Sequence, residues 1–416
     1  MMNQIIKYKD DPSKLESLYR KSKRSFINSF NEIYPQLEGN AMAEFWKARL
    51  GYKQEQDGIS WGSRKEFRFV LILAFLAGLF AKTQQMFDID EDFFYPRNLA
   101  FIAIPPITAY FATKNKLTSD RIWGIISIIL GSLIYINLLP DERTSDTLTL
   151  ACIHMPLLLW AVLGFAFSGN DYQNLDNRMG FLRFNGDVII MGVVLGGAFG
   201  LMSGLTIGLF DLIGVNIDEF YTKYVLIFGL ASIPPIATHL TQANPQLVSK
   251  VSPIVAKIFS PLVLIMLVTY LGAIVYSGKD PYNDREFLLL FNMLLIGVLA
   301  LIFFSVAESS KDSNAKVGNW VLGGLSIVTI IVNLVALSAI AFRINEYGIT
   351  PNRMAVLGVN VIMLVHLVLV CGKLIKLIRN QAEIDEVGQS IARFLPVYFF
   401  WTAIVAFLFP LIFNFQ

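Results

Sequence analysis

The sequence predicts an all-α fold, a polytopic transmembrane helix bundle with about 11 spans. Hydrophobic residues make up 55% of the 416 residues and charged residues only 16%, which is more apolar surface than a soluble core of this size needs. The charges gather between apolar stretches of roughly twenty residues, the length of a helix that crosses about 30 Å of hydrocarbon. The surplus apolar side chains are therefore expected to face lipid.

Residues 1–65 are expected to form a cytoplasmic region with amphipathic helices. Charges occur throughout this region, and it holds no apolar stretch of the kind found in a secretory signal. Ser13 and Glu16 have the spacing of a capping box. The helix that follows would carry basic residues on one face and an apolar stripe on the other, formed by Leu15, Leu18, Tyr19, Phe26, Phe30 and Ile33. Such a helix fits either an anionic membrane surface or the protein's own loops, and residues 1–65 are also a candidate docking element for a protein partner.

Residues 66–416 are predicted to form the transmembrane domain. Ser63 and Glu66, again at capping-box spacing, precede the first span. The predicted spans are 67–87, 98–113, 121–139, 148–168, 187–213, 219–240, 254–277, 286–307, 319–342, 353–373 and 393–414. Cytoplasmic loops collect Lys and Arg, and a chain that starts inside places about 26 of these residues inside and about eight outside. We therefore expect an N-inside, C-outside orientation.

Two spans carry the same interruption. Ile104-Pro105-Pro106-Ile107 lies in the second span and Ile233-Pro234-Pro235-Ile236 in the sixth, and each proline removes a backbone donor from the helix. Because four spans separate the two copies, both cross in the same direction. This predicts a parallel duplication of a four-span unit, with repeats at 66–168 and 185–307 and three further spans. The alternative is that Pro-Pro arose independently at two helix kinks.

All three histidines lie within or at the ends of spans, where ionisable side chains mark pathways or bind neighbouring helices. His154, His239 and His366 could share a proton relay, or each imidazole could simply bond to an adjacent helix. No His-x-x-His or similar spacing is present, so neither a metal nor a cofactor is predicted. His239 is the strongest candidate, because Pro234 and Pro235 leave free carbonyls that need donors.

The fifth span has glycines at a four-residue period, at Gly192, Gly196, Gly197, Gly200, Gly204 and Gly208. Such a stripe is typical of close helix packing, and the alternative is a hinge or a pore-lining helix. Asp187 flanks the stripe, and Glu308 ends the eighth span. Both carboxylates are interpreted as groups at the ends of helices.

The loop between the ninth and tenth predicted spans is the most distinctive local sequence. Gly348 can take a positive φ in a tight turn, and Thr350-Pro351 can cap and start the next span. Arg343, Glu346 and Arg353 could form an ion-paired cluster with Tyr347 beside it. We consider this cluster either a structural clasp or a site for an anionic headgroup or solute.

The same loop carries a family resemblance. Tyr347-Gly348-Ile349-Thr350 followed by Asn352-Arg353, placed between two late spans, resembles the signature loop of a bacterial family of polytopic inner-membrane proteins known as domain of unknown function 4153. The resemblance implies a multi-pass protein of the bacterial inner (cytoplasmic) membrane. It supplies no activity and no catalytic residues.

Three function classes fit these patterns. Walker A, Gly-x-Ser-x-Gly, zincin and dinucleotide motifs are absent from the sequence, so catalysis of the soluble type is not predicted, and nucleic-acid binding has no support. The favoured hypothesis is a transporter- or channel-like permease for a small solute or ion, surrounded by membrane lipids. The alternatives are a membrane scaffold or assembly factor of the cell envelope, and a lipid-binding sensor or enzyme.

Overall fold

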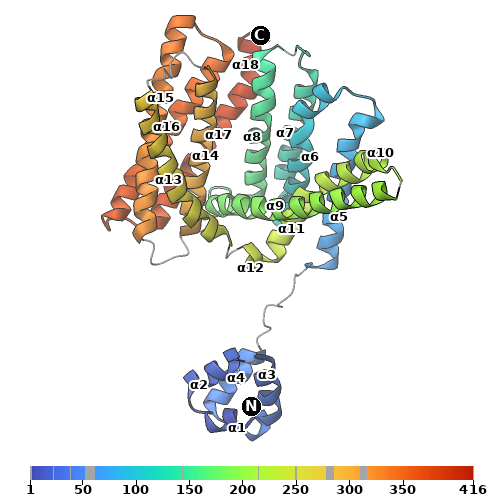
Figure 1. The fold of residues 1–416 in the computed structure, drawn as a ribbon, viewed down its shortest axis with the longest axis vertical. Coiled ribbons are helices and arrows are strands. Elements are labelled where there is room, and N and C mark those ends of the chain that lie inside the picture. Colours follow the sequence, from blue (N-terminus) through green and yellow to red (C-terminus); the bar gives the residue numbers. More distant parts are fainter. Residues whose placement is uncertain are drawn as a thin grey trace. The chain divides into compact units, whose positions relative to one another are not determined.

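The computed structural model consists of helices (Figure 1). It describes residues 2–21, 23–37, 39–51, 61–142, 144–213, 215–248, 251–277, 285–309 and 316–415. The described residues contain no strand, which confirms the all-α prediction. The chain divides into two compact units, Met1–Ser60 and Trp61–Gln416, which are described separately.

The N-terminal unit has a hydrophobic core of its own. Its helices are α1 (Met2–Lys7), α2 (Pro12–Lys21), α3 (Lys23–Ile33), the short 3₁₀ helix η1 (Tyr34–Gln36) and α4 (Ala41–Gly51). Phe26 of α3 is fully buried, and its ring lies 4.9 Å from that of Trp46 on α4. The predicted apolar stripe is thus buried within the unit, where Leu15, Tyr19, Phe30 and Ile33 join the same core. Because these side chains pack inside the unit, the stripe does not form a flat apolar surface.

The start of α2 differs from the predicted capping box. The helix begins at Pro12, and the backbone N–H of Lys14 donates to Asp11 Oδ1 at 3.1 Å. Glu16 instead pairs with Arg20 and Arg49, each at 2.8 Å. The hydrogen bond from Arg20, with the charge of Arg49, holds the pKa of the Glu16 carboxyl below its usual value. A proline at the first helical position with an aspartate before it therefore sets this helix start.

The second unit contains the long apolar helices. Their bounds are α5 (Arg64–Met86), α6 (Glu91–Lys114), α7 (Ser119–Leu138), α8 (Asp146–Ser168), α9 (Leu175–Leu212), α10 (Asp218–Phe220), the π-helical turn η2 (Tyr221–Leu226), α11 (Ile227–Ala243), α12 (Pro245–Val248), α13 (Val251–Ser277), α14 (Arg285–Ser309), α15 (Lys316–Tyr347), α16 (Pro351–Ile378), α17 (Ile384–Ala403), η3 (Ile404–Leu408) and α18 (Phe409–Ile412). Within the described residues, ten helical segments are long and apolar enough to cross a membrane.

The number of these segments is ten and not the predicted eleven because α6 is not among them. This helix has 24 residues, enough to span the hydrocarbon, but it is not among the ten apolar segments. It starts with Glu91 and Asp92 and contains a buried arginine, Arg97, and a buried asparagine, Asn98. The polar half of α6 therefore lowers its hydropathy, while its 98–113 segment matches the predicted second span.

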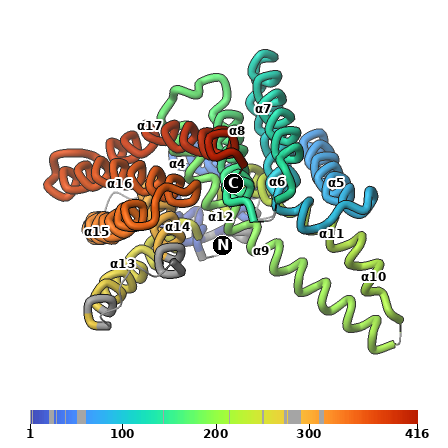
Figure 2. Tube along the Cα trace, turned by 90° about the horizontal axis from the view of Figure 1, so that it is seen from above, coloured from blue at the N-terminus to red at the C-terminus, as the bar shows by residue number. Residues whose placement is uncertain are grey.

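The first half of α9 joins two groups of helices, one formed by α5–α8 and the other by α13–α17 (Figures 1 and 2). Phe181 and Phe184 pack into an apolar cluster with α5, α6 and α8. Leu182, on the other side of the helix, packs into a cluster formed by α13–α17. The helix begins at Leu175, twelve residues before the predicted span, because Asn174 caps it through the backbone N–H of Asp176.

The second half of α9 has few neighbours. Figure 1 shows α9 running across the direction of α7 and α8, and Figure 2 shows its far end, with α10, extending away from the other helices. A side chain added at five of the six glycines of the stripe would meet no atom within 4 Å, and at Gly196 only Ile233 at 3.7 Å. The close packing predicted for this stripe is therefore not found within the described chain.

The two halves of α9 should respond differently to the same substitution. A Cβ at Gly186 would lie 2.0 Å from a ring carbon of Phe304 on α14, whereas one at Gly200 would meet nothing. We expect Gly186→Ala to destabilise the protein by about 1–3 kcal/mol through overpacking. Gly200→Ala should be neutral or slightly stabilising, since alanine favours a helix by about 1 kcal/mol over glycine. Thermal unfolding of the purified variants in one detergent measures both, and equal midpoints would contradict this packing.

Candidate functional site

Side chains from three helices meet at one carboxylate in the second unit. Tyr110 of α6 donates its hydroxyl to Glu66 Oε1 of α5 at 2.6 Å. His239 of α11 places Nδ1 3.6 Å from the same oxygen, and its Nε2 donates to the backbone carbonyl of Trp61 at 3.1 Å. The His239 side chain is 1% exposed, and that of Glu66 is 34% exposed. The group is called the Glu66 cluster below.

Local sequence positions each member of the Glu66 cluster. The Ser63 hydroxyl accepts a hydrogen bond from the backbone N–H of Glu66 at 3.2 Å, as the capping-box spacing predicts, and this fixes Glu66 in the first turn of α5. Tyr110 follows Pro106 by four residues, and His239 follows Pro235 by four. The residue four positions after each Pro-Pro segment therefore reaches the same carboxylate.

The two Pro-Pro helices lie side by side and run in the same direction at this site. Ile107 of α6 and Ile236 of α11 belong to one apolar cluster. Near their C-terminal ends, Lys114 Nζ of α6 donates to Gln242 Oε1 of α11 at 2.8 Å. The structure thus brings Pro105-Pro106 and Pro234-Pro235 together, and both helices remain continuous through their prolines.

His239 makes one hydrogen bond in the Glu66 cluster. A carbonyl oxygen only accepts, so the ring proton at Nε2 is committed to Trp61. Nδ1 lies 3.6 Å from Glu66 Oε1, beyond hydrogen-bond distance, and is buried without a hydrogen-bond partner among the described residues. The contact between Glu66 and His239 is therefore only partly satisfied in this arrangement.

Two buried hydroxyls flank His239 on α11. Thr238 and Thr241 are 0% and 3% exposed, and their Oγ1 atoms have no hydrogen-bond partner among the described residues. Unsatisfied buried polar atoms are rare in folded proteins and call for a physical reason. A second arrangement of α11, or water reaching this face, would satisfy them.

The other two histidines lie elsewhere. His154 Nδ1 donates to the carbonyl of Leu150 within α8 at 2.8 Å. His366 Nδ1 lies 3.1 Å from the hydroxyl of Tyr398, and its ring packs between Phe303 and Phe394, with centroids at 4.6 and 4.4 Å. The structure does not bring the three histidines into one relay. Among the described residues, no three His, Cys, Asp or Glu side chains are gathered in a group that could hold a metal ion.

The loop before α16 is a clasp made by one arginine. Arg353 Nη1 donates to the carbonyls of Tyr347 and Gly348 at 2.8 and 2.7 Å. Gly348 has φ +80°, and Thr350 caps α16 through the backbone N–H of Arg353 at 3.3 Å, both as predicted. Arg343 and Glu346 form no ion pair with Arg353 in this described segment, so the expected ionic cluster is not formed.

Two arginines that pair with other parts of the chain, the half-buried Arg183 and the buried Arg97, were not anticipated from the sequence. Arg183 of α9 lies with Nε 3.2 Å from Glu308 Oε1 of α14, and Glu308 is 3% exposed. Glu308 is thus a buried ion-pair partner as well as a helix-end residue. Arg97 of α6, 3% exposed, contacts Asp141 Oδ1 at 3.1 Å and the carbonyl of Ile136 at 3.2 Å. The sequence signal for both was an arginine inside an otherwise apolar helix.

The comparisons with known proteins give no relative: no family model, no curated protein and no solved structure matches the chain. The class is defined by the fold alone. The apolar helices make this an integral membrane protein that crosses the membrane several times. The resemblance of the Tyr347–Arg353 loop to the family of unknown function stays a prediction.

The Glu66 cluster predicts an energetic coupling between α5 and α6. Glu66→Gln replaces the charged acceptor of the 2.6 Å contact by a weaker neutral one, and Tyr110→Phe removes its donor, so each should destabilise the protein by about 1–3 kcal/mol. The double variant should lose less than the sum, with a coupling of at least about 0.5 kcal/mol. Unfolding in detergent measures the cycle, and Glu91→Gln with Tyr110→Phe is the control. Additive effects in both cycles would show that the contact contributes nothing.

Proposed function

We propose that this integral membrane protein is a transporter-like permease for a small solute or ion, with α6 and α11 as the moving helices of its pathway. The observation that carries the proposal is the convergence of two Pro-Pro helices on Glu66. Pro-Pro interruptions at corresponding places in two parts of a transporter are the best pointer from sequence to its pathway. Here the two interruptions lie in adjacent, parallel helices and share one polar partner.

Physical chemistry links this arrangement to motion. Each proline inside α6 and α11 leaves a carbonyl four residues earlier without its helical donor, so both helices can bend at the same level. The Glu66 cluster holds their ends together on the side of Trp61. Because the contact between Glu66 and His239 is only partly satisfied, its rearrangement would let α11 bend relative to α5.

A scaffold or assembly function is the second candidate. Its supporting observation is the N-terminal unit, which buries Phe26, Phe30 and Trp46 in a separate core while leaving Phe45 57% exposed. Such a unit suits a protein partner on the side of the membrane where residues 1–60 lie. This function needs no water pathway beside α11.

Water access to α11 separates the two candidates. Thr238 and Thr241 are buried. Each is replaced in turn by a single cysteine, in a background without Cys152 and Cys371. If α11 opens, an impermeant thiol reagent should label both positions slowly, and Glu66→Gln should raise the rate about tenfold by weakening the closing contact. A cysteine at Val193, 70% exposed on the apolar surface of α9, is the control whose rate should not change.

Complete protection of Thr238 and Thr241 with and without Glu66→Gln would contradict the permease and favour the scaffold.

A further inference from the structure

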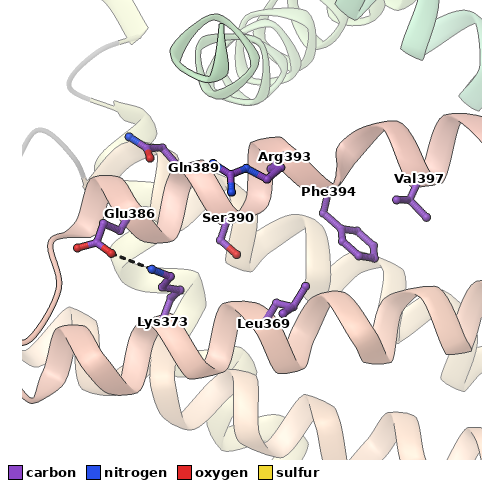
Figure 3. Close-up of a pocket in the computed structure, with 8 residues that line it drawn as sticks. All are labelled: Leu369, Lys373, Glu386, Gln389, Ser390, Arg393, Phe394 and Val397. Carbon is purple, nitrogen blue, oxygen red and sulfur yellow. Dashed lines mark hydrogen bonds and ion pairs between the residues drawn. The ribbon is translucent and has the colours of Figure 1, made fainter. Parts of the chain in front are cut away.

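A cavity lies between α16 and α17, away from the Glu66 cluster. Its volume is about 290 Å³. Figure 3 shows that polar side chains line the end nearest the turn between these helices, and that apolar side chains line the other end. Lys373, Glu386 and Ser390 belong to the polar end, and Leu369 and Val397 to the apolar end. The cavity is therefore amphipathic along its length.

Contacts place the polar end of the cavity on the same side of the bundle as the start of α5. Arg178, at the start of α9, donates to the carbonyl of Ala392 in α17 at 3.1 Å. The end of α8, just before α9, is joined to the end of α6, where the side chain of Asn115 donates to the carbonyl of Ala166 at 3.0 Å. Tyr110, near the same end of α6, donates to Glu66 on α5. This is the side predicted to face the cytoplasm, where anionic phospholipids attract basic side chains.

The charges of the cavity do not balance. Lys373 Nζ and Glu386 Oε2 form an ion pair at 2.8 Å, drawn as a dashed line in Figure 3. Arg393 lines the same cavity but has no hydrogen bond or ion pair among the described residues. It lies nine residues after Ile384, about 14 Å along the axis of α17 at 1.5 Å per residue. Arg393 is exposed and stands at the start of the predicted span 393–414, where an anionic group at the membrane surface is the partner that its guanidinium would meet.

We propose that this cavity binds an anionic phospholipid. Its phosphate would accept hydrogen bonds from Arg393 and from the Ser390 hydroxyl, and an acyl chain would lie along Leu369, Phe394 and Val397. A planar guanidinium matches the geometry of phosphate oxygens. A free phosphate would leave the apolar end unfilled, and an uncharged lipid would leave Arg393 unpaired. The inference is independent of the proposed permease function.

The test is lipid binding to the full-length, delipidated protein by native mass spectrometry. Phosphatidylglycerol should bind more tightly than phosphatidylcholine of the same chain length. Arg393→Gln should weaken phosphatidylglycerol binding about tenfold, the loss of one charge-assisted contact, and should leave phosphatidylcholine binding unchanged. Arg379→Gln is the matched control. Arg379 caps the C-terminal end of α16, on the side of the polar end of the cavity, but does not line the cavity.

Three results would overturn the proposal. Equal losses in the Arg393→Gln and Arg379→Gln variants would mean that only general surface charge attracts the lipid. Unchanged binding in Arg393→Gln would remove the site. Displacement of phosphatidylglycerol by inorganic phosphate alone would make it a site for a free anion. Arg393→Lys, which keeps the charge, should retain most of the binding, and an unchanged unfolding temperature verifies that each variant is folded.

Discussion

Hydrocarbon offers no hydrogen bonds, so a polar side chain inside the helix bundle is stabilised by a partner within the protein. The first half of α9 shows the consequence most clearly. Arg183 donates to the carbonyl of Ala307 and pairs with Glu308 on α14, and Asn185 accepts from the indole of Trp160 on α8 at 2.9 Å. Because these partners lie in different groups of helices, satisfying α9 also holds α5–α8 against α13–α17. The asparagine pair of Asn98 and Asn137 joins α6 to α7 in the same way, with two hydrogen bonds of 2.9 Å.

The Glu66 cluster follows the same constraint but differs in one respect. The hydrogen bonds of Arg183 and of the asparagines are made in this one arrangement. His239 Nδ1, 3.6 Å from Glu66, and the hydroxyls of Thr238 and Thr241 beside it lack hydrogen-bond partners among the described residues. A polar group that is only partly satisfied marks the place where a second arrangement can compete. That contrast is why we place the moving part of the molecule at α6 and α11 and regard α9 as the fixed part.

Much of the helix layout was predictable, because a span needs only length and hydropathy. The start of α5 at Ser63 and that of α16 at Thr350 followed from local capping chemistry. The partners of Glu66 could not be predicted in this way, since Tyr110 and His239 lie 44 and about 170 residues further along the chain. The early start of α9 was not predicted because its first turns carry Arg178 and Arg183. Arginines next to an apolar stretch indicate a loop when their partners, here on α17 and α14, are not known.

The central claim is that the C-terminal ends of α6 and α11 lie together at Glu66. Its most direct measurement is cross-linking in native membranes of cysteines at Lys114 and Gln242, in a background lacking Cys152 and Cys371, with a short bis-maleimide and mass spectrometry of the linked peptides. The contact of 2.8 Å between these side chains predicts an efficient link within one chain. A pair at Asp92 and Gln242, at opposite ends of the same helices, should give none. Absence of the 114–242 link, or equal links in both pairs, would contradict the account.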